Sequence, residues 1–411
     1  MTTKNESDAR ASALHEAIDV DAVVALTRAL VAIPSANPPG DESAVAAHLV
    51  EVLENLGLST EIVEPAPGRV SVLAMTGDGR ETGKPILLVN GHIDTVPADP
   101  SSWSHDPFAA EVHHGRIYGR GTTDMKGGVA AAISAYAVCR QIGMPLPCEL
   151  VFHFVSDEEL GGKHGTAHLL ETGRIVADAA LIPEPTSLKL CLAERGLLFA
   201  RITTIGVPAH GSEPSRGRSA IMSAAAIAES LHGSTFSADS HPLLGRTTCN
   251  VGMIRGGSGP NVVPESCELL IDRRAIPGDT LDSLIAGIEH RIATVGLEPD
   301  EYDLEVQTYC EPSEISVDAP FVGILSKSFR EMTGRDAAFT GLPFTTDARF
   351  IRNQLGLPAV VFGPGDLSLA HTIDEYVEID DLVTAVAVYA HLFSNFTGPK
   401  QKTSPMEMFG A

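Results

Sequence analysis

Short, predominantly apolar runs that end in polar residues constrain the fold of this chain more than any other feature. Residues 86–89, 149–155, 179–182 and 359–362 form such runs, which are typical of strands that are covered on both faces. Amphipathic helical patterns, such as the one over residues 45–56, lie between them. Strands that alternate with helices predict a doubly wound α/β domain with a mostly parallel sheet.

Imidazole and carboxylate side chains follow these runs, and in such sheets ligands bind beyond the carboxyl ends of the strands. Each of these side chains could also have an ordinary structural role. The three adjacent carboxylates at 157–159 could form a solvated turn, and the single residues could be helix caps or hydrogen-bonded turn histidines. Their joint placement favours a centre for two divalent metal ions, which needs both ligand types. The candidate ligands are His92, Asp124, Glu159, Glu184 and His371, with Asp94 as a carboxylate that orients the His92 ring.

Residues 195–309 have a different pattern from the rest of the chain. Strands are predicted at 197–205, 248–254, 266–273 and 302–309, and helices at 217–231 and 280–294. This order matches a ferredoxin-like α+β unit. We therefore expect residues 195–309 to be a domain inserted between the two parts of the α/β domain, 1–194 and 310–411. Residues 1 to about 18 are expected to be a frayed lead-in and the tail after Thr397 to be mobile.

Five motifs, at 91–97, 119–128, 156–162, 183–186 and 370–372, resemble those of the M20 family of metallo-amidohydrolases, in the same order. The resemblance implies two zinc ions, although cobalt and manganese also suit such ligands. By that resemblance Asp124 bridges both ions, His92 and Glu184 complete one site, and Glu159 and His371 complete the other. Glu158 is then the general base, Asp94 lies behind His92, and the peptide after Asp124 is cis. Pro183 departs from the family pattern, in which glycine is common.

The resemblance extends to the expected inserted domain. It implies that His210 reaches the active site of a neighbouring subunit, so that a homodimer forms through this domain. It also implies that Arg274, Asn261, Thr346 and Arg349 contact or flank the substrate. From the residues alone, His210 could belong to a capping loop, Asn261 to a turn and Arg274 to a surface pair.

The function implied is hydrolysis of an N-acyl amino acid, in the manner of acetylornithine deacetylase in arginine biosynthesis. Succinyl-diaminopimelate desuccinylase, a metallo-dipeptidase and a metallo-carboxypeptidase stay open, as does a non-catalytic, metal-stabilised dimer that binds amino-acid derivatives. The formal charge of −24 argues against nucleic acid as a partner and weakly favours a cationic substrate. A chain with no apolar run of membrane-spanning length and six scattered cysteines is expected to be cytoplasmic.

Overall fold

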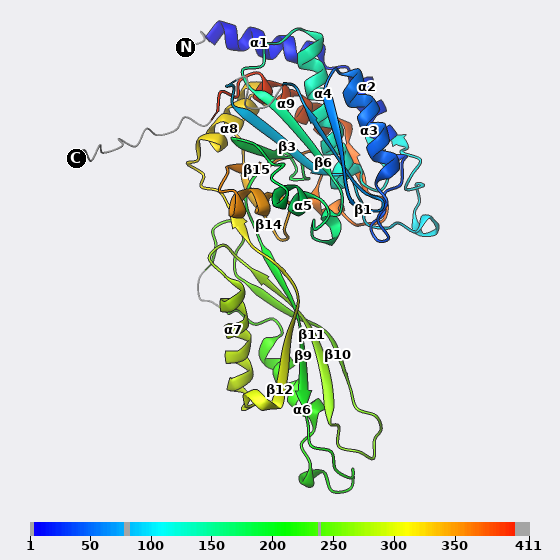
Figure 1. Cartoon of the computed structure of the whole chain (residues 1–411), viewed down its shortest axis with the longest axis vertical. Coiled ribbons are helices and arrows are strands. Elements are labelled where there is room, and N and C mark those ends of the chain that lie inside the picture. Colours follow the sequence, from blue (N-terminus) through cyan, green and yellow to red (C-terminus); the bar gives the residue numbers. More distant parts are fainter. Residues whose placement is uncertain (1–3, 78–82, 237–239, 399–411) are drawn as a thin grey trace, which may run out of the picture. The chain divides into compact units, whose positions relative to one another are not determined.

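A computed structural model describes residues 4–77, 83–236 and 240–398 (Figure 1). The chain forms two compact units. Unit 1 contains 315–340 and the described parts of 1–192 and 350–411, and unit 2 contains the described parts of 193–314 together with 341–349. The expected insertion, 195–309, lies within unit 2, whereas the inclusion of 341–349 was not expected.

The main sheet of unit 1 is parallel at its centre and antiparallel at its flanks. Its strands follow the order β1-β2-β6-β3-β7-β15-β8, and the parallel pairs are β6–β3, β3–β7 and β7–β15. The last two residues of β8 pair in unit 2 with β13 (Ser313–Glu314), and β14 (Phe339–Leu342) also pairs with β8. The main strands are β1 (Ser59–Ala66), β2 (Arg69–Met75), β3 (Ile86–His92), β6 (Glu149–Val155), β7 (Ala179–Ile182), β8 (Leu190–Glu194) and β15 (Ala359–Val361).

Helices cover both faces of this sheet, which confirms the doubly wound α/β prediction. Successive strand residues point to opposite faces, and Val89 of β3 packs in the same core cluster as residues of the long helices. The next residue, Asn90, instead donates to the Thr166 hydroxyl of α5 at 3.2 Å, so α5 lies on the other face. The helices are α1 (Lys4–Ala17), α2 (Val20–Val31), α3 (Ser43–Asn55), α4 (Gly127–Gln141), α5 (Thr166–Glu171), α8 (Pro320–Thr333) and α9 (Ile379–Phe393).

The expectation of a frayed N-terminus is wrong for the described residues 4–17, which form helix α1. Leu14 is fully buried, the guanidinium of Arg10 donates to the Ser394 carbonyl oxygen at 3.2 Å, and His15 Nε2 donates to the Met332 carbonyl oxygen at 2.9 Å. Packing on α8 and α9 holds this polar helix in place. Most of the tail expected after Thr397 lies outside the described residues, which end at Gly398.

A small three-stranded sheet brings two distant segments of unit 1 together. Its order is β16-β5-β4, with β4 (Val112–His113), β5 (Arg116–Tyr118) and β16 (Tyr376–Glu378). Several short helical turns also belong to this unit: η2 (Pro100–Ser102), η3 (Thr122–Lys126), η4 (Glu158–Leu160), η7 (Phe350–Gln354) and η8 (Leu367–Leu369). Of these, η3 contains Asp124, and η4 contains Glu158 and Glu159. The pairing of β16 with β5 places the segment after His371 beside the segment before Asp124.

Unit 2 has the predicted ferredoxin-like order of elements. Its antiparallel sheet has the order β10-β11-β9-β12, and one face of it shares a buried apolar core with two helices. The elements are β9 (Gly196–Ile205), α6 (Ala220–Leu231), β10 (Thr248–Gly256), β11 (Ser266–Ala275), α7 (Leu281–Thr294) and β12 (Tyr302–Cys310), with the turns η5 (Pro214–Arg216) and η6 (Pro299–Glu301). Strand β10 forms one edge of this sheet.

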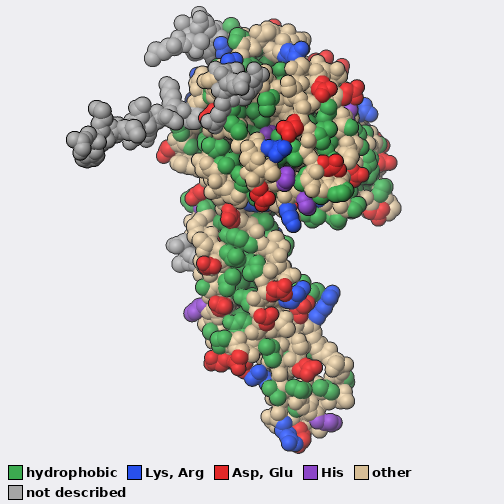
Figure 2. Space-filling view, viewed as in Figure 1, with side chains coloured by type: hydrophobic (Ala, Val, Ile, Leu, Met, Phe, Trp, Pro, Cys, Tyr) green, Lys and Arg blue, Asp and Glu red, His purple; other side chains and the backbone are tan. Residues whose placement is uncertain are grey.

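The surface shows no sign of a specialised acidic face in the view of Figure 2, where Asp and Glu side chains are scattered over each unit. This distribution agrees with a general contribution of charge to solubility. Among the described helices, none combines the length and the apolar composition that a membrane span requires.

Candidate metal centre

His92 is the last residue of the buried strand β3 and is 1% exposed. Its Nδ1 lies 2.9 Å from the backbone carbonyl oxygen of Asp94. Because a carbonyl oxygen can only accept, this contact places the proton on Nδ1 and leaves the lone pair on Nε2. Nε2 faces Asp124 Oδ1 at 3.0 Å and Glu184 Oε1 at 3.4 Å. The ring is thus oriented as a ligand toward two carboxylates.

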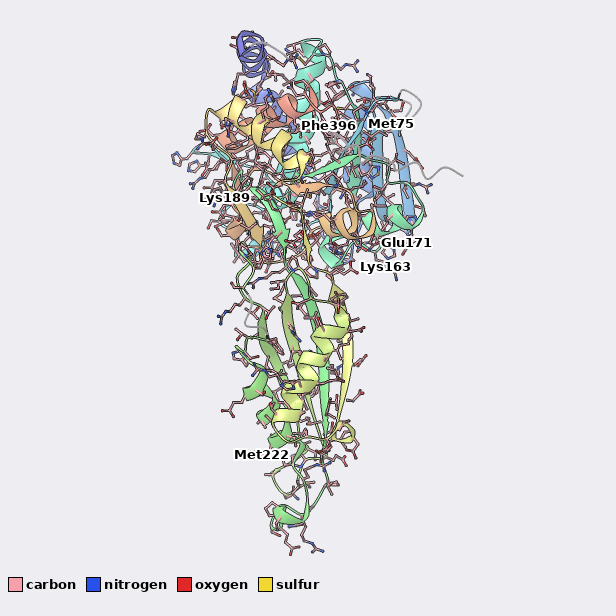
Figure 3. All side chains as sticks on the ribbon, turned by 90° about the vertical axis from the view of Figure 1, so that its left-hand side faces the viewer. Met75, Lys163, Glu171, Lys189, Met222 and Phe396 are labelled. Carbon is pink, nitrogen blue, oxygen red and sulfur yellow. The ribbon has the colours of Figure 1, made fainter. Side chains whose placement is uncertain are left out.

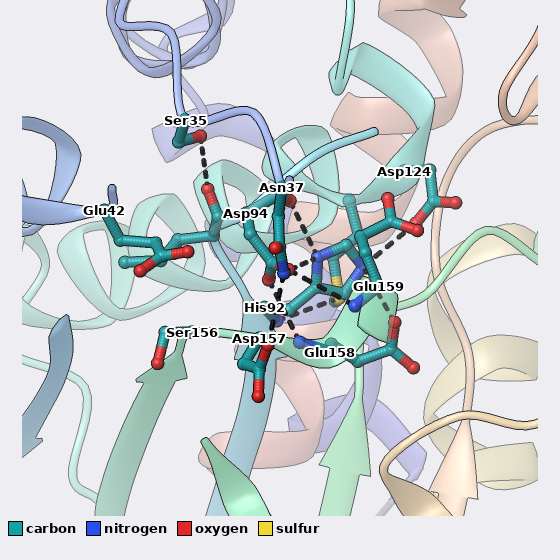
Figure 4. A network of polar contacts seen from close by, with 12 residues as sticks. Ser35, Asn37, Glu42, His92, Asp94, Asp124, Ser156, Asp157, Glu158 and Glu159 are labelled. Atoms are coloured by element: carbon teal, nitrogen blue, oxygen red, sulfur yellow. Dashed lines mark hydrogen bonds and ion pairs between the residues drawn. The ribbon is translucent and has the colours of Figure 1, made fainter. Parts of the chain in front are cut away.

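Asp124 stands between two histidines that come from opposite ends of the chain. Its Oδ1 faces His92, and its Oδ2 lies 3.3 Å from Nε2 of His371. The same Nε2 is 3.0 Å from Glu159 Oε2. The peptide between Asp124 and Met125 is cis, as the resemblance implied. A carboxylate that offers one oxygen to each of two histidines has the geometry of a bridging ligand. Figure 4 shows the part of this cluster around His92, Asp124 and Glu159.

Glu184 follows β7 in a segment that lies against the first turn of α4. A Cβ atom on Gly128 would lie 1.9 Å from the Pro183 carbonyl oxygen, so only glycine allows this close approach. Glu184 is 3% exposed. Although Pro183 stands where the family resemblance leads us to expect glycine, Glu184 still faces His92.

The carboxylates after β6 complete the cluster. Two groups of ligand atoms each lie within 4.8 Å of one another, one from His92, Asp124 and Glu159 and the other from His92, Glu158 and Glu184. Glu158 Oε2 is 4.0 Å from His92 Nε2, whereas Glu159 Oε1 also accepts from the Val96 amide at 3.1 Å. The structure therefore brings all five predicted ligands and Glu158 together in unit 1.

The electrostatics of this cluster suit bound cations. Burial, together with the charge of Asp124, raises the pKa of Glu184 to about 8. Hydrogen bonds to Asp124 and Glu159 raise the pKa of His371 to about 10. The cluster therefore holds protons at neutral pH in positions that divalent ions would take. Imidazole nitrogens and carboxylate oxygens suit zinc, cobalt or manganese, so the residues fit the metals that the sequence implied.

Asp94 contacts the His92 ring through its backbone carbonyl oxygen and also through its carboxylate. Its Oδ1 is 3.6 Å from His92 Nδ1 and accepts from the Glu158 amide at 3.2 Å, while Oδ2 accepts from the Glu159 amide at 3.2 Å. Burial raises the pKa of Asp94, but these bonds and those from His92 and Asn37 lower it overall. The carboxylate of Asp94 thus fixes the backbone that carries Glu158 and Glu159.

Asp157 supports the same turn from behind, through partners that the sequence did not identify. It accepts hydrogen bonds from the Arg69 guanidinium, from Asn37 Nδ2 at 3.3 Å and from the His164 amide at 2.9 Å. Arg69 also donates to Glu42 Oε1 at 2.7 Å. Arg69 and Glu42 are both buried, and an arginine that opens a strand carries no sequence signal of such a contact.

The remaining predicted residues lie in unit 2. An isolated bridge pairs His210 with Val262, and the Gly211 amide donates to the Asn261 carbonyl oxygen at 2.8 Å, so these two loops adjoin. Arg274 pairs with Asp272 on its own strand at 3.0 Å. The Thr346 hydroxyl donates to Glu194 Oε2 at 2.7 Å, and Arg349 donates to the Thr346 carbonyl oxygen at 3.1 Å. Thr346 and Arg349 are buried and engaged with each other and with Glu194.

Comparisons with known proteins agree with this geometry. Residues 88–395 match the family model of Peptidase family M20/M25/M40. A succinyl-diaminopimelate desuccinylase of Methylorubrum populi is 30% identical over 91% of this chain and 98% of its own, and an acetylornithine deacetylase of Myxococcus xanthus is 32% identical over 84% and 90%. The crystal structure of a dinuclear metal binding peptidase of the M20 family from Bacillus subtilis has a TM-score of 0.68 at 17% identity, covering 93% of this chain and 98% of the other.

Proposed function

Since the chain belongs to the M20/M25/M40 family of hydrolases, we propose that it is a two-metal amidohydrolase that removes the acyl group from an N-acyl amino acid. The observation that carries this proposal is the convergence of two histidines and four carboxylates in unit 1. Relatives named for deacetylation and desuccinylation support the same reaction class.

In this proposal Asp124 would be shared between two zinc ions. His92 and Glu184 would hold one ion, and Glu159 and His371 would hold the other. The bound ions would polarise the amide carbonyl and lower the pKa of a water molecule between them. Cobalt or manganese could replace zinc because a mixed set of borderline imidazole nitrogens and hard carboxylate oxygens accepts each of these ions.

Glu158 is assigned as the general base. It follows Asp157 on a turn whose amides are held by Asp94, so its carboxylate is aimed independently of that of Glu159. Glu158 takes a proton from the attacking water and delivers it to the leaving nitrogen as the carbon–nitrogen bond breaks. The products are a carboxylate and a free amine, and the reaction needs no protein nucleophile.

A homodimer through unit 2 is also proposed, with His210 stabilising the oxyanion in the partner's active site. Its support is the edge strand β10, whose Ile254 is 49% exposed, together with Met222 of α6, which is 67% exposed (Figure 3). Exposed apolar side chains beside an unpaired strand edge are typical of a surface that another chain covers. A cytoplasmic location is proposed as well, since all six cysteines are free thiols.

The proposed substrate is an N-acetylated amino acid such as N-acetylornithine, and the alternatives are N-succinyl-diaminopimelate and dipeptides. Arg274 would exchange its bond with Asp272 for the substrate α-carboxylate, because a guanidinium can fork onto a carboxylate. Asn261 lies in the loop at the opposite end of the β10–β11 hairpin, next to the His210 loop, so it would reach the substrate of the partner subunit together with His210. We assign Thr346 and Arg349 to holding the 346–349 loop in place rather than to substrate contact. Thr346 donates to Glu194, and Arg349 donates to the Thr346 carbonyl oxygen.

An amine-release assay on metal-free protein reloaded with zinc or cobalt tests the proposal. The panel compares N-acetylornithine, N-succinyl-diaminopimelate, other N-acetyl amino acids and dipeptides. We expect metal-dependent release of amine, greatest with an N-acetylated substrate. Greater release from a succinylated substrate or a dipeptide would favour that alternative. Binding of amino-acid derivatives without any hydrolysis would overturn the enzyme proposal and favour the non-catalytic dimer.

The role of Glu158 is tested by Glu158→Gln, with Glu171→Gln on the exposed end of α5 as a control. If Glu158 is the general base, Glu158→Gln should leave the metal content unchanged while turnover falls by about 10²–10⁴-fold. Loss of a metal ion from Glu158→Gln would instead make Glu158 a ligand, as its position in one of the two ligand groups allows.

A further inference from the structure

A buried glutamate connects the segment of His371 to the backbone of Asp124. Glu375 is fully buried and lies four residues after His371. Its Oε1 accepts from the Thr123 amide at 2.8 Å and from the Asp124 amide at 3.1 Å. Its backbone oxygen accepts from the Gly119 amide at 2.9 Å. The carboxylate thus fixes the peptide units on either side of Thr123 directly.

Arg120 completes this connection in the opposite direction. Its Nη1 donates to Glu375 Oε2 at 2.5 Å, and its Nη2 donates to the Thr372 carbonyl oxygen at 3.2 Å. The guanidinium lies 5.1 Å from the centre of the Trp103 ring and is 4% exposed. Thr372 directly follows His371, so Arg120 anchors the residue next to that ligand. Each segment therefore binds the other beside a candidate metal ligand.

Asp124 and His371 depend on this connection more than the other ligands do. His92 ends β3 and Glu184 follows β7, and these strands pair directly in the main sheet. His371 is instead in a loop, with its side chain 53% exposed, and faces Asp124 and Glu159. The separation between Asp124 and His371 is not set by any strand pair of the main sheet.

We propose that Glu375 and Arg120 form a positioning pair that holds Asp124 and His371 at the separation a metal ion between them requires. This inference rests on the proposed two-metal function, and it concerns chiefly the ion that Asp124, Glu159 and His371 would hold. Groups that orient ligands in this way typically contribute about 10–100-fold to metal affinity. The ion that His92 and Glu184 would hold shares Asp124 but not His371, so its affinity should change less.

The substitution Glu375→Gln tests the proposal with little change in shape. Its amide oxygen can still accept from the backbone amides, but its NH₂ group then faces the Arg120 guanidinium as donor against donor, and the buried charge of Arg120 loses its counter-charge. The double variant Glu375→Gln with Arg120→Gln removes the charge and restores a donor–acceptor pair. The matched control is Glu378→Gln, three residues further on, where Glu378 pairs with Arg116 at 2.8 Å on the surface.

Titration of the metal-free full-length protein with Zn²⁺ in a calorimeter, and with Co²⁺ followed by its visible spectrum, measures both ions separately. We expect two binding events in the wild type and in Glu378→Gln. Glu375→Gln should weaken one event about 10–100-fold and the other by clearly less, and the double variant should recover part of that loss. Should Glu375→Gln not fold, Arg120→Lys, which keeps the charge but loses the forked contact, is expected to weaken the same event.

The outcomes separate this inference from the function on which it rests. A wild type that binds fewer than two ions overturns the two-metal proposal and the positioning pair with it. A wild type with two events and a Glu375→Gln variant within about twofold of it overturns the positioning pair alone. Equal weakening of both events, or no recovery in the double variant, shows general damage to the fold and also overturns it.

Discussion

Replacement of Arg69 by methionine is expected to destabilise unit 1 strongly. Arg69 is 7% exposed and neutralises two buried carboxylates, Glu42 at 2.7 Å and Asp157. Methionine fills a similar volume but leaves both carboxylates without their cation. Removal of one partner from a buried ion pair costs about 3–5 kcal/mol. The free energy of unfolding should therefore fall by about that amount in Arg69→Met.

Urea unfolding in the presence of EDTA, followed by circular dichroism, measures this effect without a contribution from bound metal. Arg116→Met is the matched control, because Arg116 and Glu378 form a pair of similar length whose side chains are 38% and 41% exposed, and surface pairs contribute little. Arg69→Met should also lower kcat by about tenfold or more, since Asp157 precedes Glu158 on the same turn. If the urea concentration at the unfolding midpoint of Arg69→Met is as close to that of wild type as the midpoint of Arg116→Met is, Arg69 does not stabilise unit 1 in this way.

Three further outcomes are expected. Burial lowers the pKa of His153 from 6.5 to about 4, so the unfolded chain binds the proton more tightly than the folded one. Between pH 7 and pH 4.5 the unfolding free energy of wild type should therefore fall by about 2–3 kcal/mol relative to that of His153→Leu. A difference between the two proteins that stays constant with pH would contradict this. Chelation of the metals should lower stability by about 4 kcal/mol for each ion removed, compared with protein in free zinc at about 1,000 times the dissociation constant of each site, and an unchanged melting temperature would argue against structural coupling of the ions. His210→Ala mixed with Glu158→Gln should give more activity than either alone if His210 acts on the partner's site, whereas a fully active His210→Ala excludes that role.

The sequence predicted which imidazole and carboxylate side chains would converge, because their positions follow from local patterns. An apolar run that ends at His92, or one that precedes residues 157–159, fixes where a strand stops, and the carboxyl ends of parallel strands gather at one edge of a sheet. Strand β3 is buried along its whole length, as its composition indicates. Such a pattern can be recognised from residues that are adjacent in the sequence, and the family motifs then indicate which polar residues are candidate ligands.

The contacts behind the ligands could not be predicted because they join residues that are far apart in the chain. Arg120 and Glu375 are separated by 255 positions, and neither has a neighbour that marks it as buried. Helix α1 was missed for the same reason, since its composition is polar and its order comes from contacts of residues such as Arg10 and Leu14 with the rest of unit 1. The Thr346 loop was placed beside the substrate by resemblance alone, which says nothing of its bond to Glu194.

The distribution of buried cations explains why the inner cluster needs metal ions. The Arg69 guanidinium binds Glu42 and Asp157, and that of Arg120 binds Glu375 and the Thr372 carbonyl. The ammonium group of Lys126 donates to the carbonyl oxygens of Leu30 and Ile33 at 3.0 and 2.7 Å. These cations bind groups around the cluster. Like charges held as close as those of Asp124, Glu159 and Glu184 are unfavourable unless a cation lies between them, and protons on His371 and Glu184 supply only part of that charge. We therefore expect divalent ions to supply the rest.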